Sequence, residues 1–231
     1  MILRIRHFFL LPACCLLLNC TSMALSASAD NYPDEWWTPV PAEQLAPWEI
    51  GPQAADRKKG EVILSKRNEL GLLSNFAPAP FTFRGQHFAS VEGLWQSLKY
   101  PENPQDERYN PMVTWPYTRA QVEQMTAFEA KDAGKIANQN MKKLRIDWVS
   151  FQGEKIHYQT TDQKAHYELI FYATSEKILQ NSNVKEVLLK TGNLNLLPDH
   201  QQGANDPPAY GYNLIAMKIR LALQKGDIPK P

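Results

Sequence analysis

The sequence predicts an α+β fold: a compact, mainly helical single domain with a small antiparallel sheet. The 231 residues have an ordinary content of apolar and charged side chains, which is enough for one sizeable hydrophobic core. Strand patterns come early in the chain and helical patterns late. This order lacks the strict alternation of a doubly wound parallel sheet and contains no internal repeat.

The first 29 residues have the three parts of an export signal. Two arginines precede an apolar run over residues 8–18, and small residues end the segment at Ala27-Ser28-Ala29. The run is too short to anchor a helix across a bilayer. Cleavage after Ala29 would give a periplasmic or secreted protein. The alternative is a lipid on Cys20, because Leu17-Leu18-Asn19-Cys20 resembles a bacterial lipoprotein box. In either case we expect membrane attachment only through the leader or that lipid.

Charge and cysteine content exclude several functions. Without the two leader arginines, 23 basic residues stand against 24 acidic ones, so we expect no bulk nucleic-acid binding. All three cysteines lie in the leader, which excludes thiol catalysis and thiolate metal sites in the mature chain. The five histidines are scattered, and phosphate-loop, nucleophile-elbow and dinucleotide fingerprints are absent. We predict neither a metal nor a cofactor.

Residues 30–60 are rich in proline and tryptophan. The prolines forbid regular helix or central strand, and it is costly to leave Trp36, Trp37 and Trp48 in water. We expect an extended arm that packs over the globular body. The alternative is a polyproline-type ligand for a partner. The catalytic domain would then span residues 61–226.

The early part of that domain contains strands and loops. Residues 61–65 and 81–88 have strand patterns, and the second turns at Arg84-Gly85. The proline-rich stretch 100–117 is expected to be a surface excursion and a candidate lid. A further short strand is expected at 194–197.

Helical periodicity dominates the later part. Helices are expected over residues 118–140, 163–180, 184–190 and 212–224. In the first, Thr118 is the cap, and Phe128 shares a buried side with Val122 and Met125. Gly134 costs that helix about 1 kcal/mol against alanine, so close packing or close ligand approach is expected there. In the last, Leu214, Ile215, Met217 and Leu221 are expected to face inward.

Residues 90–99 carry the most informative motif. At about 100° per residue, one helical face holds Val91, Leu94 and Leu98. The other face groups a carboxylate, an indole, an amide and an amine, from Glu92, Trp95, Gln96 and Lys99. Glu92 and Lys99 lie about two turns apart, so their side chains can converge on a small substrate for acid/base or Schiff-base chemistry. The alternative is a solvated face, since glutamate and lysine are mostly exposed.

Two further residues have a structural and a functional interpretation. Asp206 lies in a loop with little room for regular structure, where it serves either an Asx-type turn before Pro207 or a catalytic site. Trp148 ends an apolar stretch and is either a core residue or a platform on which a base stacks.

The order of the motifs resembles the NADAR family of YbiA-like N-glycosidases over about residues 61–224. The resembling motifs are Ser74-Asn75-Phe76, Pro80-Phe81, Gly85, Ser90-x-Glu92 with Gln96 and Lys99, Ala130-Lys131 with Gly134, Trp148, Leu189 to Gly192, Asp206, and Gly211-Tyr212-Asn213 before Arg220. The resemblance implies a compact α+β fold without a metal. It also implies an enzyme that cleaves N-glycosidic bonds between ribose and a base. The substrates it implies are ribosylamino intermediates of riboflavin synthesis, or guanine in nucleic acid that carries ADP-ribose.

By position, the resemblance implies a catalytic set of Glu92, Lys99 and Asp206, with Glu92 as the principal carboxylate. It implies substrate contacts from Asn75, Phe76, Trp95, Gln96, Gly134, Trp148, Tyr210 and Asn213. The chain departs from the family at two places. Gly93 stands where a histidine is common, and Tyr210-Gly211-Tyr212 replaces a Trp-Gly pair and a longer glycine-rich turn. A stacked base would then lie on Tyr210.

Two routes to bond cleavage are compatible with these residues. A carboxylate beside C1′ stabilises positive charge on the sugar while an acid protonates the departing base. Alternatively, Lys99 captures C1′ of a ring-opened ribose as a Schiff base while Glu92 shuttles protons. This route needs an unprotonated amine, which partial burial favours.

Export separates the protein from cytoplasmic riboflavin intermediates, so an ADP-ribose conjugate or another nucleotide-like small molecule is the preferred partner. Two functions other than hydrolysis stay open. One is a catalytically inactive ADP-ribose or nucleotide-binding module of the cell envelope, and the other is an envelope structural protein.

Overall fold

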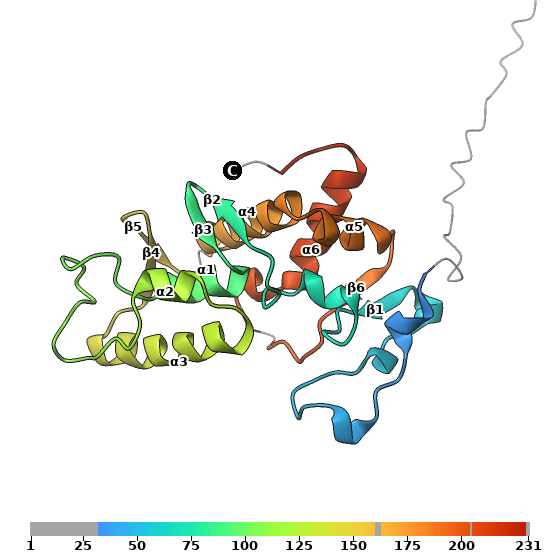
Figure 1. The fold of residues 1–231 in the computed structure, drawn as a ribbon, viewed down its shortest axis with the longest axis horizontal. Coiled ribbons are helices and arrows are strands. Elements are labelled where there is room, and N and C mark those ends of the chain that lie inside the picture. Colours follow the sequence, from blue (N-terminus) through green and yellow to red (C-terminus); the bar gives the residue numbers. More distant parts are fainter. Residues whose placement is uncertain (1–31, 160–162, 204, 230–231) are drawn as a thin grey trace, which may run out of the picture.

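The computed structural model describes residues 32–159, 163–203 and 205–229. The predicted export signal at 1–29, with Cys20, lies outside the described residues. Helices mixed with short strands confirm the predicted α+β class (Figure 1). The α-helices are α1 (Val91–Ser97), α2 (Arg119–Glu123), α3 (Ala127–Leu144), α4 (Lys164–Gln180), α5 (Ser182–Lys190) and α6 (Tyr212–Gln224). Over the described ranges, no helix combines the length and apolar character needed to cross a membrane.

The strands pair two by two. β2 (Phe81–Phe83) and β3 (Gln86–Phe88) form an antiparallel hairpin, as do β4 (Trp148–Phe151) and β5 (Glu154–His157). β1 (Glu61–Ile63) pairs in parallel with β6 (Asn195–Leu197), so the two ends of the domain are joined. The sequence did not predict the second hairpin. Its turn has positive φ at Gln152 and Gly153, 52° and 82°, as two-residue hairpin turns require.

Helix α1 packs against α2, α3 and α4. Ser90 caps it: the hydroxyl oxygen accepts the Gly93 N–H (2.9 Å) and the hydroxyl donates to the Met125 carbonyl (2.9 Å). The apolar face predicted for this helix is fully buried, from Val91, Leu94 and Leu98. This orientation turns the polar face toward the opposite side, where the candidate site lies.

The single helix expected over 118–140 is two helices, α2 and α3. Thr118 does cap the first, in a capping box with Gln121. Beyond α2 the Met125 carbonyl accepts from Ser90. Ala127 opens α3 with a φ of 47°, a conformation that a residue with a β-carbon rarely adopts. Phe128, expected to be buried, is 46% exposed.

Helix α6 has the predicted bounds but buries a different face. Leu214 and Leu221 were expected to face inward and are more than half exposed. The buried residues are Ile215, Ala216 and Ile219. The expectation was correct for Ile215 and wrong for Leu214 and Leu221, because apolar residues occur on every side of this helix and its periodicity does not identify one inward side.

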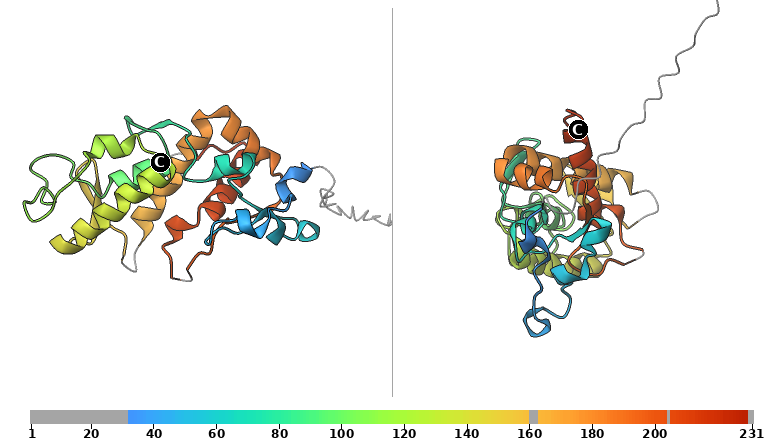
Figure 2. Two further views of the ribbon diagram at one scale, coloured as in Figure 1. Left: turned by 60° about the horizontal axis from the view of Figure 1, so that its bottom comes forward. Right: turned by 90° about the vertical axis from the view of Figure 1, so that its right-hand side faces the viewer.

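The arm packs over the body as expected, through short 3-10 turns at Asp34–Trp37, Ala42–Gln44, Pro52–Ala54 and Arg57–Lys59. Trp36 is fully buried in the main core, and its indole N–H donates to Glu69 (3.0 Å). The Trp37 indole donates to the Glu61 carbonyl (2.8 Å). Figure 2 shows the arm, in blue, at one end of the domain. Two of its three tryptophans therefore serve the fold.

The excursion at 101–117 is held by a buried arginine. The Arg108 guanidinium donates to the Leu98 carbonyl (2.7 Å) and forms an ion pair with Asp106 (2.6 Å). The Trp115 indole N–H donates to the Arg108 carbonyl (2.9 Å). These contacts tie the excursion to Leu98, the residue that directly follows α1.

Candidate active site

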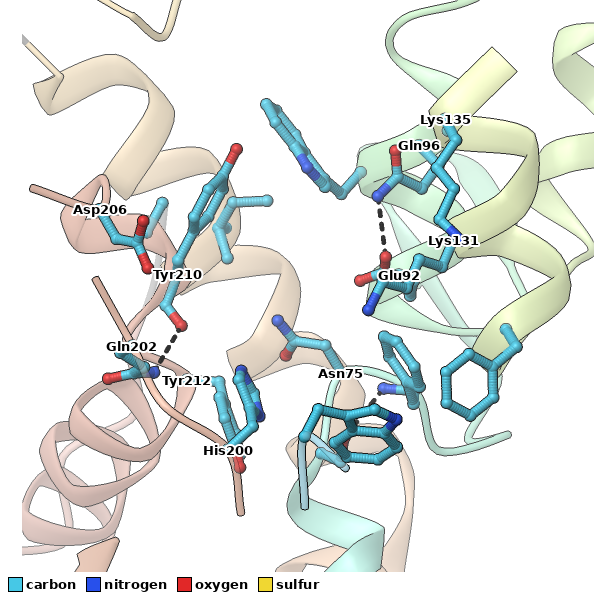
Figure 3. Close-up of a pocket in the computed structure, with 18 of the residues that line it drawn as sticks. Asn75, Glu92, Gln96, Lys131, Lys135, His200, Gln202, Asp206, Tyr210 and Tyr212 are labelled. Atoms are coloured by element: carbon cyan, nitrogen blue, oxygen red, sulfur yellow. Dashed lines mark hydrogen bonds between the residues drawn. The ribbon is translucent and has the colours of Figure 1, made fainter. Parts of the chain in front are cut away.

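A cavity of about 670 Å³ brings together segments that are far apart in the sequence. In Figure 3, Glu92, Gln96, Lys131 and Lys135 form one wall, and Asp206, Gln202 and Tyr210 form the facing wall. Asn75 and His200 lie between the two. The excursion at 100–117 contributes no lining residue to this cavity.

The Glu92 carboxyl is fixed on the α1 wall. Its backbone N–H donates to the Asn75 carbonyl (3.0 Å), and its Oε1 accepts from Gln96 Nε2 (2.8 Å). Burial raises the pKa of this carboxyl, against the opposing Gln96 hydrogen bond and the charges of nearby lysines. A carboxyl with a raised pKa is suited to give and take protons near neutral pH.

Lys99 supplies a buried amine at the same wall. The residue is 3% exposed, and its Nζ lies 5.1 Å from the centre of the Trp95 ring. Burial lowers the pKa of Lys99 from 10.5 to about 8, although Glu92 opposes the shift. At pH 7 about a tenth of the amine is then unprotonated and nucleophilic.

Gly134 explains how Gln96 keeps its position. A β-carbon at residue 134 would lie 1.8 Å from Gln96 Oε1, so the amide occupies the space that the glycine leaves on α3. Gln96 in turn holds the Glu92 carboxyl. The glycine predicted to mark close packing is therefore needed for close packing of a site residue.

The loop that carries Asn75 and Phe76 is fixed by hydrogen bonds from α4. The Lys177 ammonium is buried in α4 and donates to the carbonyls of Leu72 (2.8 Å) and Ser74 (2.7 Å). Phe76 N–H donates to the Ser74 hydroxyl oxygen (3.2 Å). Both predicted contact residues of this loop line the cavity.

On the facing wall, Asp206 stabilises a turn with the residues before it and also lines the cavity. Its Oδ2 accepts the Gly203 N–H (2.8 Å), which closes a turn, and the exposed side chain also lines the cavity. The Tyr210 ring lies 6.1 Å from Trp95. Burial, with the charges of its neighbours, raises the pKa of the Tyr210 hydroxyl, which stays protonated.

His166 is a site residue that the sequence analysis missed. It lies in α4, is 1% exposed, and stacks on Trp95 with ring centres 4.3 Å apart. Burial, with the nearby Lys99 charge, lowers the pKa of His166 to about 4, so the imidazole is neutral at pH 7. The sequence around His166 contains no motif that would predict a site residue, because it is a single histidine on a largely apolar helix.

The cavity contains buried polar atoms that lack a partner. Over the described residues, eight buried side-chain nitrogen or oxygen atoms make no hydrogen bond, and four of them belong to cavity-lining residues: Asn75 Oδ1, Gln96 Oε1, and His166 Nδ1 and Nε2. Unpaired buried polar groups are rare and call for an explanation. The unpaired Asn75 oxygen needs a donor, and the neutral His166 imidazole needs one donor and one acceptor, so a ligand with several hydroxyl groups, which both donate and accept, matches them.

Two predicted contacts lie outside the cavity. Trp148 is buried in β4, between the Arg108 guanidinium at 4.7 Å and the Lys155 ammonium at 4.2 Å from its ring centre. The Asn213 amide donates to the Leu196 carbonyl (2.9 Å) and secures β6. Neither lines the site. Predicting them as substrate contacts was wrong, because both side chains serve packing.

The structure also explains the departure at Gly93. A β-carbon there would lie 2.4 Å from the Met125 carbonyl oxygen. A histidine at this position therefore requires the connection between α2 and α3 to move. Gly93 instead allows close packing of α1 on this connection.

Comparisons with known proteins give one distant likeness. No protein-family model matches the chain, and no curated protein sequence matches it. The NMR structure of the E. coli protein YbiA is similar with a TM-score of 0.40 and 17% identity, over 72% of this chain and 86% of that one. No group of three or more histidine, cysteine or acidic side chains that could hold a metal occurs in the described part of the chain.

Proposed function

We propose that the protein is an N-glycosidase that hydrolyses the bond between C1′ of a ribose and a nitrogen of a base. The observation that carries this proposal is the pair formed by Glu92 and Lys99 in one cavity. Burial raises the pKa of the Glu92 carboxyl and lowers the pKa of the Lys99 amine to about 8. Two titratable groups shifted toward neutrality are typical of acid/base and nucleophilic sites.

The lysine route uses both groups. Protonated Glu92 gives its proton to the ring oxygen, the C1′–O4′ bond breaks, and an iminium forms between C1′ and the base nitrogen. The Lys99 lone pair adds to C1′ and its proton passes to the Glu92 carboxylate. The base nitrogen then takes that proton and leaves, so C1′ remains joined to Lys99 as a Schiff base. Water adds to C1′ while the Glu92 carboxylate takes its proton and passes it to the departing Lys99 amine, so the sugar leaves as an aldehyde at C1′ that closes again to the ribose ring; from an ADP-ribose conjugate the product is ADP-ribose.

The carboxylate route needs Glu92 to be ionised beside the developing positive charge. Burial works against the ionised form of this carboxyl. It also needs a separate acid for the base, for which Asp206 is the candidate on the facing wall. We therefore favour the lysine route.

The remaining lining suits a ribosyl substrate. Asn75 Oδ1 is an unpaired acceptor that a ribose hydroxyl can satisfy. The rings of Trp95, His166 and Tyr210 lie near one another and supply an aromatic wall for a base. The favoured substrate is an ADP-ribose conjugate such as ADP-ribosylated guanine, with a ribosylamino-pyrimidine of riboflavin type as the other candidate. The predicted leader favours the first, because it would place the enzyme outside the cytoplasm.

A catalytically inactive nucleotide-binding module is the second candidate. It is favoured by Gly93, because the Met125 carbonyl fills the space of a side chain that active relatives would use.

Hydrolysis assays on ADP-ribosylated guanine and on a ribosylaminouracil separate these functions. We expect the native chain to release the base, and we expect Glu92→Gln and Lys99→Met to lose at least about a hundredfold in kcat. Lys143→Met, an exposed lysine on α3, is the matched control. Equal turnover by native chain and Glu92→Gln would refute the site. Tight binding of ADP-ribose without turnover would favour the module.

A further inference from the structure

The arm does more than cover the core, because residues Pro47 to Ile50 line the cavity. Trp48 is 44% exposed there, unlike Trp36. The backbone beside it is fixed: Ile50 N–H donates to the Asp199 carbonyl (2.7 Å), and Glu49 pairs with Arg67 (2.6 Å). An indole held on an anchored backbone and left half in water contributes little to the fold, so its position calls for a ligand.

A second exposed ring faces it. Phe128, on the first turn of α3, lies with its ring centre 5.9 Å from Trp48 and 5.3 Å from Phe76. The residue before it, Ala127, has the strained φ of 47° and donates its N–H to the Phe76 carbonyl (3.2 Å). Strained backbone is found preferentially where a site needs a side chain in a fixed place.

An exposed lysine ammonium lies beside these rings. Lys131 is exposed, and its Nζ is 5.8 Å from the ring centres of both Phe76 and Phe128. With the residues that the structure describes, Lys131 makes neither a hydrogen bond nor an ion pair. Lys66, the other ammonium near Trp48, is already engaged by Asp199. Lys131 interacts with Glu92 only through its charge and contacts the two rings, so its ammonium still has hydrogen-bond donors to offer an anionic group.

We propose that Trp48, Phe128 and Lys131 form a second binding site at the mouth of the cavity. It takes a planar heteroaromatic ring that is joined through a phosphate to the reacting ribose: the ring stacks on the indole and the phosphate meets the ammonium. This inference rests on the proposed function and deepens it, since it makes the arm part of the substrate site. The cavity volume of about 670 Å³ is of the size that holds a ligand with both parts.

Calorimetric binding of two ligands to the full chain tests the second site. ADP-ribose carries the distal ring and both phosphates, whereas ribose 5-phosphate lacks the ring. Stacking is lost in Trp48→Ala, so we expect about a tenfold weaker affinity for ADP-ribose and an unchanged affinity for ribose 5-phosphate. Trp48→Phe should restore most of the affinity. Lys131→Ala should weaken both ligands.

Matched controls are Tyr109→Ala, an exposed aromatic outside the cavity, and Lys143→Ala on the far part of α3. Neither should change binding. The second site is overturned if Trp48→Ala binds ADP-ribose as tightly as the native chain, or if it loses the same factor for both ligands. Tryptophan-dependent ADP-ribose binding in a chain that releases no base would overturn the proposed catalysis and leave the second site standing. Base release by a chain whose ADP-ribose binding does not depend on Trp48 would overturn the second site and leave the proposed catalysis standing.

Discussion

Replacing Lys99 by methionine should stabilise the fold while abolishing turnover. The pKa of this amine falls from 10.5 to about 8 on folding, so keeping it protonated inside the protein costs about 3 kcal/mol, at 1.36 kcal/mol per pKa unit. Methionine fills a similar volume without a charge. The folded pKa of about 8 already includes the opposing attraction of Glu92, so we expect a gain of up to about 3 kcal/mol at pH 7.

The sign of the pH dependence follows from proton binding. Between the folded pKa of about 8 and the unfolded value of 10.5, the unfolded chain binds more protons at Lys99 than the folded chain does. The stability of the native chain therefore rises with pH through this window. The penalty is complete below pH 8 and fades toward pH 10.5. The advantage of Lys99→Met should shrink over the same interval.

Urea unfolding of both chains at pH 7 and pH 10.5, together with kcat, measures this. The control Lys143→Met alters an exposed lysine and should stay within about 0.5 kcal/mol at both pH values. The reasoning is refuted if Lys99→Met is less stable than the native chain at pH 7, or if its gain is as large at pH 10.5 as at pH 7.

Three further substitutions test how the fold holds the site. Gly134→Ala places a β-carbon 1.8 Å from Gln96 Oε1. The melting temperature should stay the same or rise, since alanine favours the helix by about 1 kcal/mol, whereas kcat should fall at least about tenfold. An unchanged kcat would contradict the role of Gly134 in positioning Gln96. Gly93→Ala meets the Met125 carbonyl at 2.4 Å and should cost about 1–3 kcal/mol in urea unfolding; a neutral result would show that the connection yields freely. Trp36→Ala removes a fully buried indole and should cost about 3–5 kcal/mol in thermal unfolding, and a loss below about 1 kcal/mol would make the arm peripheral.

Helical periodicity was a reliable guide where one face is clearly apolar. In α1, the period that buries Val91 and Leu94 also sends Glu92 and Gln96 to the cavity. In α6 the bounds were predicted but the face was not, because Leu214 competes with Ile215 for the inward side and only packing decides between them. Periodicity locates a helix more easily than it orients one.

Residues whose roles depend on tertiary contacts were harder to predict. Nothing in the spacing of His166 or Trp48 shows that α4 and the arm reach the same cavity. Trp148 and Asn213 were assigned by position along the chain, which carries no information about the direction of a side chain.

The most direct test of the central claim is borohydride trapping during turnover, followed by peptide mapping. If Lys99 attacks C1′, reduction of the Schiff base leaves a ribosyl adduct on Lys99, and the enzyme loses activity in step with its formation. The Lys99→Met chain should carry no adduct. Continued turnover in borohydride without a sugar adduct on Lys99, or an adduct on another lysine, would contradict the account.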